Sequence, residues 1–115
     1  MTEMKYEPVQ IMDKDKIHRD VNSNDPEVVA DALYSACRYD DDTQWIEKQC
    51  LCKLTSSKVT VRWAAATCLG DLALFRRPLN TTVVIAALEA AMQDVAISDP
   101  AGFSLSMVKE FLVMK

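Results

Sequence analysis

The chain has 115 residues, is 50% apolar and carries a net charge of −4 at pH 7. That length suits a single domain, and the apolar fraction is high enough to build a buried core. Its only two glycines, Gly70 and Gly102, are too few for an all-β fold with many tight turns or for a glycine-rich phosphate loop.

The charge and the N-terminal residues restrict the location and the partners. Residues 1–60 hold 12 acids and 8 bases, whereas residues 61–115 hold 5 of each. An acidic surface repels nucleic acid and favours basic partners, although mild acidity can also serve solubility alone. We find no apolar run of 18 residues and no apolar signal core. We therefore predict a cytoplasmic protein with reduced cysteines and without membrane or direct nucleic-acid contacts.

The first 24 residues differ from the rest. A densely charged run at 13–20 ends in the turn-prone sequence Asn-Ser-Asn at 22–24. We interpret residues 1–24 as a charged leader. It is either a short helix around residues 9–20 or a partly disordered tail, and the pattern is compatible with both.

From Asp25 onward the sequence predicts five helices. Asp25 followed by proline and glutamate is a strong helix start, and the first helix should end near Tyr39. Asp42 can cap a second helix over about 43–54, and Asn80 can cap a fourth over about 81–96. The fourth helix should bury Val95. The Ser-Asp-Pro sequence at 98–100 predicts a fifth helix that reaches the C-terminus.

The third helix, at about 58–75, is the most informative. Gly70 lies in its middle, where glycine costs about 1 kcal/mol relative to alanine. Close contact with the next helix is the simplest reason for it. Pro78 follows the end of the helix, and we expect Arg76 and Arg77 to cap the carbonyl groups there.

The same apolar pattern recurs along the chain. Starts at Asp25, Ser57 and Asp99 can be aligned with offsets of 32 and 42 residues, which places Val29, Val61 and Phe103 at equivalent positions. Repetition at roughly 30–45 residues is typical of stacked helical hairpins. Because the loops are short, neighbouring helices should be antiparallel, and the fold class should be all-α.

Residues 57–73 resemble the first helix of a HEAT repeat. They contain Val-Arg at 61–62, Ala-Ala at 64–65 and a small-Leu-Gly-x-Leu run at 68–72, while residues 83–95 are similar to the matching second helix. The resemblance extends over about residues 25–112. It implies a short right-handed α-solenoid of about two and a half HEAT-like hairpins, forming one domain at 25–115. The HEAT family is known for binding proteins, so the resemblance implies recognition.

The run from residue 45 to 72 also resembles short bacterial HEAT-like proteins. Some of these are immunity proteins encoded beside polymorphic toxins, as in contact-dependent growth inhibition. This resemblance implies a protein partner, which would be a toxin domain.

Metal binding and catalysis have little support. Cys50 and Cys52 are two apart and point to nearly opposite sides of a helix, so they cannot chelate zinc together. We expect Cys37, Cys50 and Cys68 to pack in the core. His18 lies in the charged leader, and we interpret it as a solvated side chain. We predict no enzyme, no catalytic residues, no cofactor and no metal.

The most distinctive polar feature is the run of three aspartates followed by a tryptophan. It is either a solvated turn with a helix cap or an acidic contact for a basic partner. Tryptophan near acids is the type of group that anchors interfaces, but Trp45 could equally lie in the core, and Trp63 has the same ambiguity. The candidate partner-binding residues are Asp40, Asp41, Asp42, Trp45 and Glu47.

These observations lead to one preferred function and one alternative. The preferred hypothesis is an immunity protein, monomeric alone and 1:1 with its partner. It would neutralise a toxin domain, a basic nuclease or RNase, by occluding its active site, with acidic side chains in place of substrate phosphates. The alternative is a non-catalytic HEAT-like scaffold or adaptor subunit of a larger complex.

Overall fold

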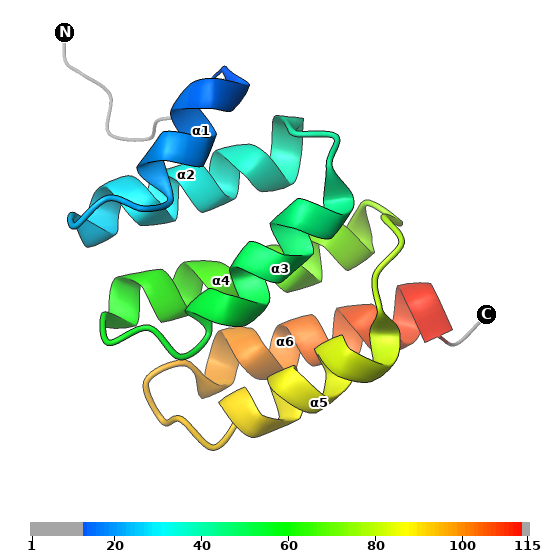
Figure 1. The fold of residues 1–115 in the computed structure, drawn as a ribbon. Coiled ribbons are helices and arrows are strands. Elements are labelled where there is room, and N and C mark those ends of the chain that lie inside the picture. Colours follow the sequence, from blue (N-terminus) through cyan, green and yellow to red (C-terminus); the bar gives the residue numbers. More distant parts are fainter. Residues whose placement is uncertain (1–12, 114–115) are drawn as a thin grey trace, which may run out of the picture.

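The structure is a computed structural model that describes residues 13–113. Within that range it contains helices and no strand (Figure 1), which confirms the predicted all-α class. The six α-helices are followed by one π-helical turn, η1. The elements are α1 (Lys14–Asp20), α2 (Pro26–Tyr39), α3 (Thr43–Lys53), α4 (Val59–Leu74), α5 (Thr81–Ala91), α6 (Ser98–Val108) and η1 (Lys109–Val113).

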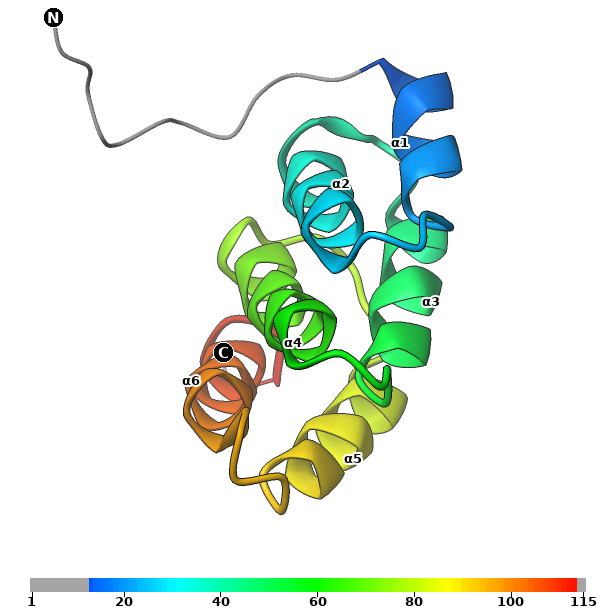
Figure 2. The ribbon, with the colours of Figure 1, turned by 90° about the vertical axis from the view of Figure 1, so that its left-hand side faces the viewer.

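The helices form two layers. Figure 2 shows α2, α4 and α6 side by side in one layer, with α1, α3 and α5 in the other. Helix α4 is central and packs against α2, α3 and α6. This alternation is compatible with stacked hairpins, while the solenoid and the membership of the HEAT family stay predictions.

Three predicted caps are confirmed. Asp25 accepts a hydrogen bond from the amide of Glu27 at 3.0 Å, with proline at the first helical position. Asp42 caps α3 and Asn80 caps α5 through their side-chain oxygens. Each cap satisfies an amide that the helix itself leaves unpaired, so these helices begin where the sequence predicted.

The predicted offset of the third unit is wrong. Phe103, aligned with Val29 and Val61, is 66% exposed. Buried positions instead recur at offsets of 32 and 36 residues in the α2, α4 and α6 regions. The equivalent sets are Val29, Val61 and Ile97; Leu33, Ala65 and Ala101; and Ala36, Cys68 and Ser104. The error came from using Asp99 as a cap: α6 begins at Ser98, after Ile97, without any side-chain cap.

The predicted fourth helix is too long. Helix α5 ends at Ala91, and Val95, which we expected to be buried, is 91% exposed. Asp94 accounts for this, because its carboxylate accepts hydrogen bonds from the amide of Ala96 and from the Nε of Arg62 on α4. These contacts hold the backbone in a turn, and Ile97 then enters the core.

Gly70 makes the close helix contact that the sequence predicted, but with α6, which is not the next helix. A Cβ atom at residue 70 would lie 2.3 Å from the Oγ and 2.9 Å from the Cα of Ser104. The Ser104 hydroxyl donates a hydrogen bond to the carbonyl of Ala66 at 2.6 Å. The two helices can approach this closely only because residue 70 lacks a side chain.

The described part of the predicted leader contains α1. This helix packs against α2 and buries Ile17, while Val21, just after it, is also buried. Residues 1–12, which include the start of the predicted helix at 9–20, lie outside the described residues. The division between leader and domain at residue 24 stays a prediction.

The predicted core role of three cysteines is confirmed. Cys37, Cys50 and Cys68 are buried as free thiols, and Cys52 is exposed. The Cys37 thiol donates to the carbonyl of Cys68 at 3.5 Å. Hydrogen bonds with Cys37 and Cys50, together with burial, raise the pKa of the Cys68 thiol well above its usual value. Cys68 therefore stays protonated and behaves as a small apolar side chain.

Candidate protein interface

The corner between α2 and α3 holds the three predicted aspartates, but their environments differ. Asp40 is buried, and its Oδ1 accepts the amide of Asp42 at 2.8 Å. Its Oδ2 lies 3.5 Å from the Nε2 of His18, and neither of these two buried atoms has a hydrogen-bond partner among the described residues. Asp40 thus positions the corner and does not present its carboxylate to solvent.

Asp41 and Asp42 are the accessible members of the run. The Asp41 side chain is 96% exposed, and the Nζ of Lys14 lies 3.6 Å from its carboxylate. Asp42 is exposed and accepts the amide of Trp45 as the cap of α3. Both carboxylates can reach a partner, although Lys14 offsets part of the negative charge of Asp41.

Trp45 faces α1. Its ring stacks on His18 with centroids 3.7 Å apart and planes within 4°, and it is partly buried against the core. The His18 side chain is 38% exposed, so it is partly solvated as predicted, but it also covers Trp45 on one side and approaches Asp40 on the other. Trp45 therefore joins α1 to α3, and only part of it remains available to a partner.

Arg77 holds this corner from the α4–α5 loop. Its guanidinium donates to the carbonyls of Asp40 at 2.8 Å and Cys37 at 3.2 Å, and to the hydroxyl of Thr43 at 2.9 Å. The prediction that Arg76 and Arg77 cap their own helix with their side chains is wrong. Their backbone amides close α4, with Arg76 at φ 61°, and the Arg77 side chain caps the carbonyl end of α2 instead.

Glu47 lies on the side of α3 that faces α5. Its carboxylate accepts the amide of Asn80 at 3.0 Å and so ties α3 to the loop before α5. A hollow of about 510 Å³ lies here. It is lined by Thr43, Gln44, Glu47, Pro78, Leu79 and Asn80.

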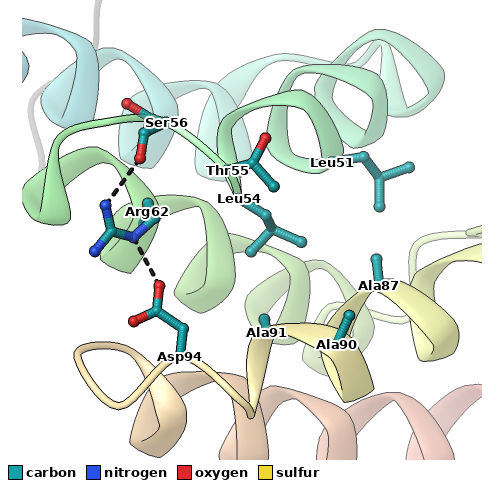
Figure 3. Close-up of a pocket in the computed structure, with 9 residues that line it drawn as sticks. All are labelled: Leu51, Leu54, Thr55, Ser56, Arg62, Ala87, Ala90, Ala91 and Asp94. Carbon is teal, nitrogen blue, oxygen red and sulfur yellow. Dashed lines mark hydrogen bonds and ion pairs between the residues drawn. The ribbon is translucent and has the colours of Figure 1, made fainter.

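A second hollow, of about 430 Å³, lies between the C-terminal parts of α3 and α5. Figure 3 shows Leu51 and Leu54 pointing toward the alanines of α5, while Arg62 bridges the end of the hollow. Arg62 donates to Asp94 at 2.8 Å and to the carbonyl of Ser56 at 2.9 Å. The lining residues are Leu51, Leu54, Thr55, Ser56, Arg62, Ala87, Ala90, Ala91 and Asp94.

We call these two hollows together the α3–α5 face. Each hollow is lined by residues of α3 and by residues in or next to α5. In the first hollow, Glu47 of α3 accepts a hydrogen bond from Asn80, and in the second, Arg62 donates one to Asp94. Leucines and small alanines form the apolar lining of the hollow near Leu51, whereas the hollow near Glu47 is lined mainly by polar residues. The face therefore offers a concave apolar surface with polar edges. Such an arrangement suits a protruding apolar side chain of a partner.

The structure therefore places the predicted residues at three locations around α3. Asp41 and Asp42 lie at its N-terminus, and Glu47 lines the α3–α5 face. Asp40 and Trp45 point toward α1. A role of all five residues in partner binding stays a prediction.

A further groove was not identified from the sequence. It lies between α2 and α4, measures about 350 Å³, and is lined by Glu27, Ala30, Asp31, Tyr34, Val59, Thr60 and Trp63. We call it the outer groove. A signal was present in the sequence, since the acids at 27 and 31 and the apolar residues at 59 and 63 are four apart, off the buried stripes of their helices.

The described residues offer neither a metal site nor a membrane-spanning helix. Within residues 13–113 there is no group of three or more histidine, cysteine or acidic side chains that could hold a metal ion. In the same range, no helix has the length and apolar character that crossing a membrane requires.

A solved structure is similar to this chain over nearly its whole length. It is a chain in the crystal structure of a CDI complex from Cupriavidus taiwanensis LMG 19424. The two chains share 27% sequence identity with a TM-score of 0.83, and the match covers 96% of this chain and 100% of the other. No protein-family model matches the chain, and no curated protein matches it.

Proposed function

We propose that this chain is an immunity protein of a contact-dependent growth inhibition system, which binds a toxin domain in the cytoplasm and blocks its activity. The observation that carries the proposal is the likeness to a chain of a CDI complex at a TM-score of 0.83 over all of that chain. A match that covers 96% of this chain and 100% of the other supports a shared role better than a match of one hairpin would. The resemblance of residues 45–72 to bacterial immunity proteins supports the same function.

The proposed contact surface is the α3–α5 face together with the acidic corner at Asp41 and Asp42. The hollow between Leu51 and the alanines of α5 has apolar walls for an anchoring side chain. The hydrogen bond that Glu47 accepts from Asn80 and the one that Arg62 donates to Asp94 hold the two sides of the face in place. A surface that is already rigid loses little entropy on binding. The exposed aspartates beside it would attract a basic toxin domain and increase its association rate.

The proposed partner is a nuclease domain with a basic active-site surface. Enzymes that act on nucleic acid must attract phosphate groups, and they therefore carry clustered lysine and arginine residues. Carboxylates at Asp41 and Asp42 can occupy the same positions as those phosphates and exclude the substrate. The overall charge of −4 supports such complementarity.

Growth protection tests the proposal directly. The protein encoded beside this gene, which the proposal expects to contain the toxin domain, is placed under an inducible promoter in bacteria, with and without this chain. We expect growth arrest with the toxin domain alone and normal growth when both are present. If this chain by itself arrests growth, it is the toxic member of the pair. If it binds only copies of itself and gives no protection, it is a scaffold.

A matched pair of substitutions locates the interface. Ala87→Trp fills the hollow shown in Figure 3, whereas Ala86→Trp makes the same change at an exposed neighbour that does not line it. We expect the first to weaken toxin binding about 100-fold in calorimetry, since it removes an anchor site, and the second by less than about threefold. Equal affinities of the two variants for the toxin would exclude this surface.

A further inference from the structure

The outer groove presents aromatic and acidic side chains together, and all of its lining residues belong to α2 and α4. These two helices lie in the layer opposite α1, α3 and α5 (Figure 2). Trp63 is 43% exposed and Val59 is 46% exposed, although both are large apolar residues. Tyr34 on α2 lies beside them and is half-buried. Exposed apolar groups gathered in one hollow are more informative than scattered ones, because they mark surfaces that bind something.

The charge of the groove defines what it can bind. Of the seven described residues that line it, Glu27 and Asp31 are acids and none is a base. Asp71 also lies near, since its charge and that of Asp31 contribute to the raised pKa of Tyr34. Burial is the main cause, and it raises that pKa to about 12, so the phenol stays neutral at physiological pH. The groove thus combines neutral aromatic rings with carboxylates.

We infer that the outer groove is a second binding site of this chain, which takes an arginine or lysine side chain of a protein partner between Trp63 and the carboxylates of Glu27 and Asp31. A cation over an indole ring is attracted by the negative face of the ring, and arginine also stacks on it. The carboxylates add charge-assisted hydrogen bonds to the same group. Val59 and Trp63 both line the groove and are four residues apart on α4, with about 6 Å between their Cβ atoms, so they can cover the aliphatic stem.

This site is separate from the α3–α5 face. Trp63 and Tyr34 belong to the layer of α2, α4 and α6, whereas Leu51 and Ala87 line the hollow on α3 and α5. The inference does not rest on the proposed immunity function, and it adds a second recognition surface to it. The two surfaces could be occupied at once, because they lie on different layers.

The two tryptophans allow a test without knowledge of the partner. The probe is the peptide acetyl-Gly-Arg-Gly-amide, and the control peptide carries citrulline, which has nearly the same shape without the charge. Binding is followed at the indole N–H signals of the whole chain by NMR, at low salt. We expect the arginine peptide to shift the Trp63 signal with a dissociation constant on the order of 1 mM, and the Trp45 signal to stay unchanged.

Substitutions complete the test. Trp63→Ala should weaken binding of the arginine peptide about tenfold, and Glu27→Gln combined with Asp31→Asn about fivefold. The matched control is Glu89→Gln with Asp99→Asn, which removes two exposed acids elsewhere and should leave the affinity unchanged. Circular dichroism melting checks that each variant is folded. The four substituted acids are exposed, so we expect unfolding temperatures of those variants close to that of the wild type. Trp63→Ala removes a side chain that is 43% exposed, so we expect a lower unfolding temperature but a folded variant.

Three results would overturn the inference. Equal binding of the citrulline peptide would show that charge plays no part. A shift at Trp45 in place of Trp63 would place the site elsewhere. A shift of the Trp63 signal with protein concentration alone would make a second copy of this chain the occupant. None of these results bears on growth protection, so the immunity proposal and this inference can fail separately.

Discussion

His18 stacks on Trp45 with the ring centroids 3.7 Å apart and the planes nearly parallel, and this contact fastens α1 to the start of α3. Stacking of two aromatic rings contributes about 0.5–1.5 kcal/mol beyond the area that it buries. The imidazole also covers the buried carboxylate of Asp40. The short helix α1 is therefore held by Ile17 in the core and by His18 at the α2–α3 corner.

The first prediction concerns this stack. His18→Ala should lower the free energy of unfolding by about 1 kcal/mol in urea denaturation followed by circular dichroism. His18→Phe is the control, because it keeps an aromatic ring on Trp45 but removes the nitrogen near Asp40. It should lose less stability than the alanine variant. If the alanine variant is as stable as the wild type, the stack of His18 on Trp45 does not stabilise the packing of α1 against α3.

The second prediction compares the two glycines. Gly70→Ala would place a methyl group 2.9 Å from the Cα of Ser104, so α4 and α6 must separate. We expect a net loss of about 1–3 kcal/mol, even though alanine favours helix formation. Gly102→Ala is the matched control, because its Cβ would meet only the flexible Met92 side chain, at 3.5 Å. It should stabilise the protein by up to about 1 kcal/mol.

The double variant Gly70→Ala with Ser104→Gly separates crowding from other effects. If crowding against Ser104 causes the loss, Gly70→Ala should cost less in the Ser104→Gly background than in the wild type. Identical costs in the two backgrounds, measured in the same urea denaturation, would show that the close approach of α4 and α6 is not the cause.

The third prediction concerns Arg77. Three of its hydrogen bonds reach residues 34 to 40 positions earlier in the chain, and two of them satisfy carbonyls at the end of α2. Arg77→Ala should cost roughly 3 kcal/mol, and lysine should recover less than half of it, because a single ammonium group cannot reach all three acceptors. Arg76→Ala, which removes only a cation–π contact with Phe111, should cost about 0.5–1 kcal/mol. Equal losses of unfolding free energy for Arg77→Ala and Arg76→Ala would show that the hydrogen bonds of Arg77 do not stabilise the α2–α3 corner.

Much of the fold could be predicted from local sequence, and the wrong end of α5 came from a contact between residues far apart in the sequence. The caps at Asp25, Asp42 and Asn80 were correct because a cap involves residues two or three apart. The end of α5 was wrong because Asp94 binds Arg62, which lies 32 residues earlier. A side-chain contact over that separation leaves no periodic signal in the sequence.

The candidate site shows the same limit. The sequence identified the acidic corner, and the structure leaves Asp41 and Asp42 exposed there. The sequence could not show that His18 covers Trp45 or that Asp40 is buried, since both depend on how α1 packs. The hollows of the α3–α5 face also required the structure, because they result from the spacing of two helices joined through α4.

The fourth prediction follows from Tyr34, whose pKa is raised from 10.0 to about 12, mainly by burial. Between these two values the unfolded chain has lost the phenolic proton while the folded chain retains it. Stability is therefore fully present below pH 10 and decreases as the pH rises through 12. Because the ring is only half-buried, we expect a loss of about 1–2 kcal/mol.

Tyr34→Phe isolates this contribution from the titration of other groups. The difference in unfolding free energy between wild type and Tyr34→Phe should shift in favour of the phenylalanine variant between pH 9 and pH 12. Urea denaturation at several pH values in this range gives the comparison. A difference that is constant across the range would mean that Tyr34 titrates in the same way in both states.

The fifth prediction concerns the exposed carboxylate of Asp41 and rests on the proposed function. Asp41→Lys reverses a charge that is fully accessible at the α2–α3 corner, while Asp40 and the cap at Asp42 stay in place. Association with a basic toxin domain should slow by about tenfold at low salt and by much less at 0.5 M salt, where exposed charges are screened. Stopped-flow fluorescence gives the rates.

Glu110→Lys makes the same charge change at an exposed residue of η1, away from this corner, and should slow association by less than about threefold. Similar effects of the two variants would show that only the total charge matters, and the corner would then have no specific role in recognition.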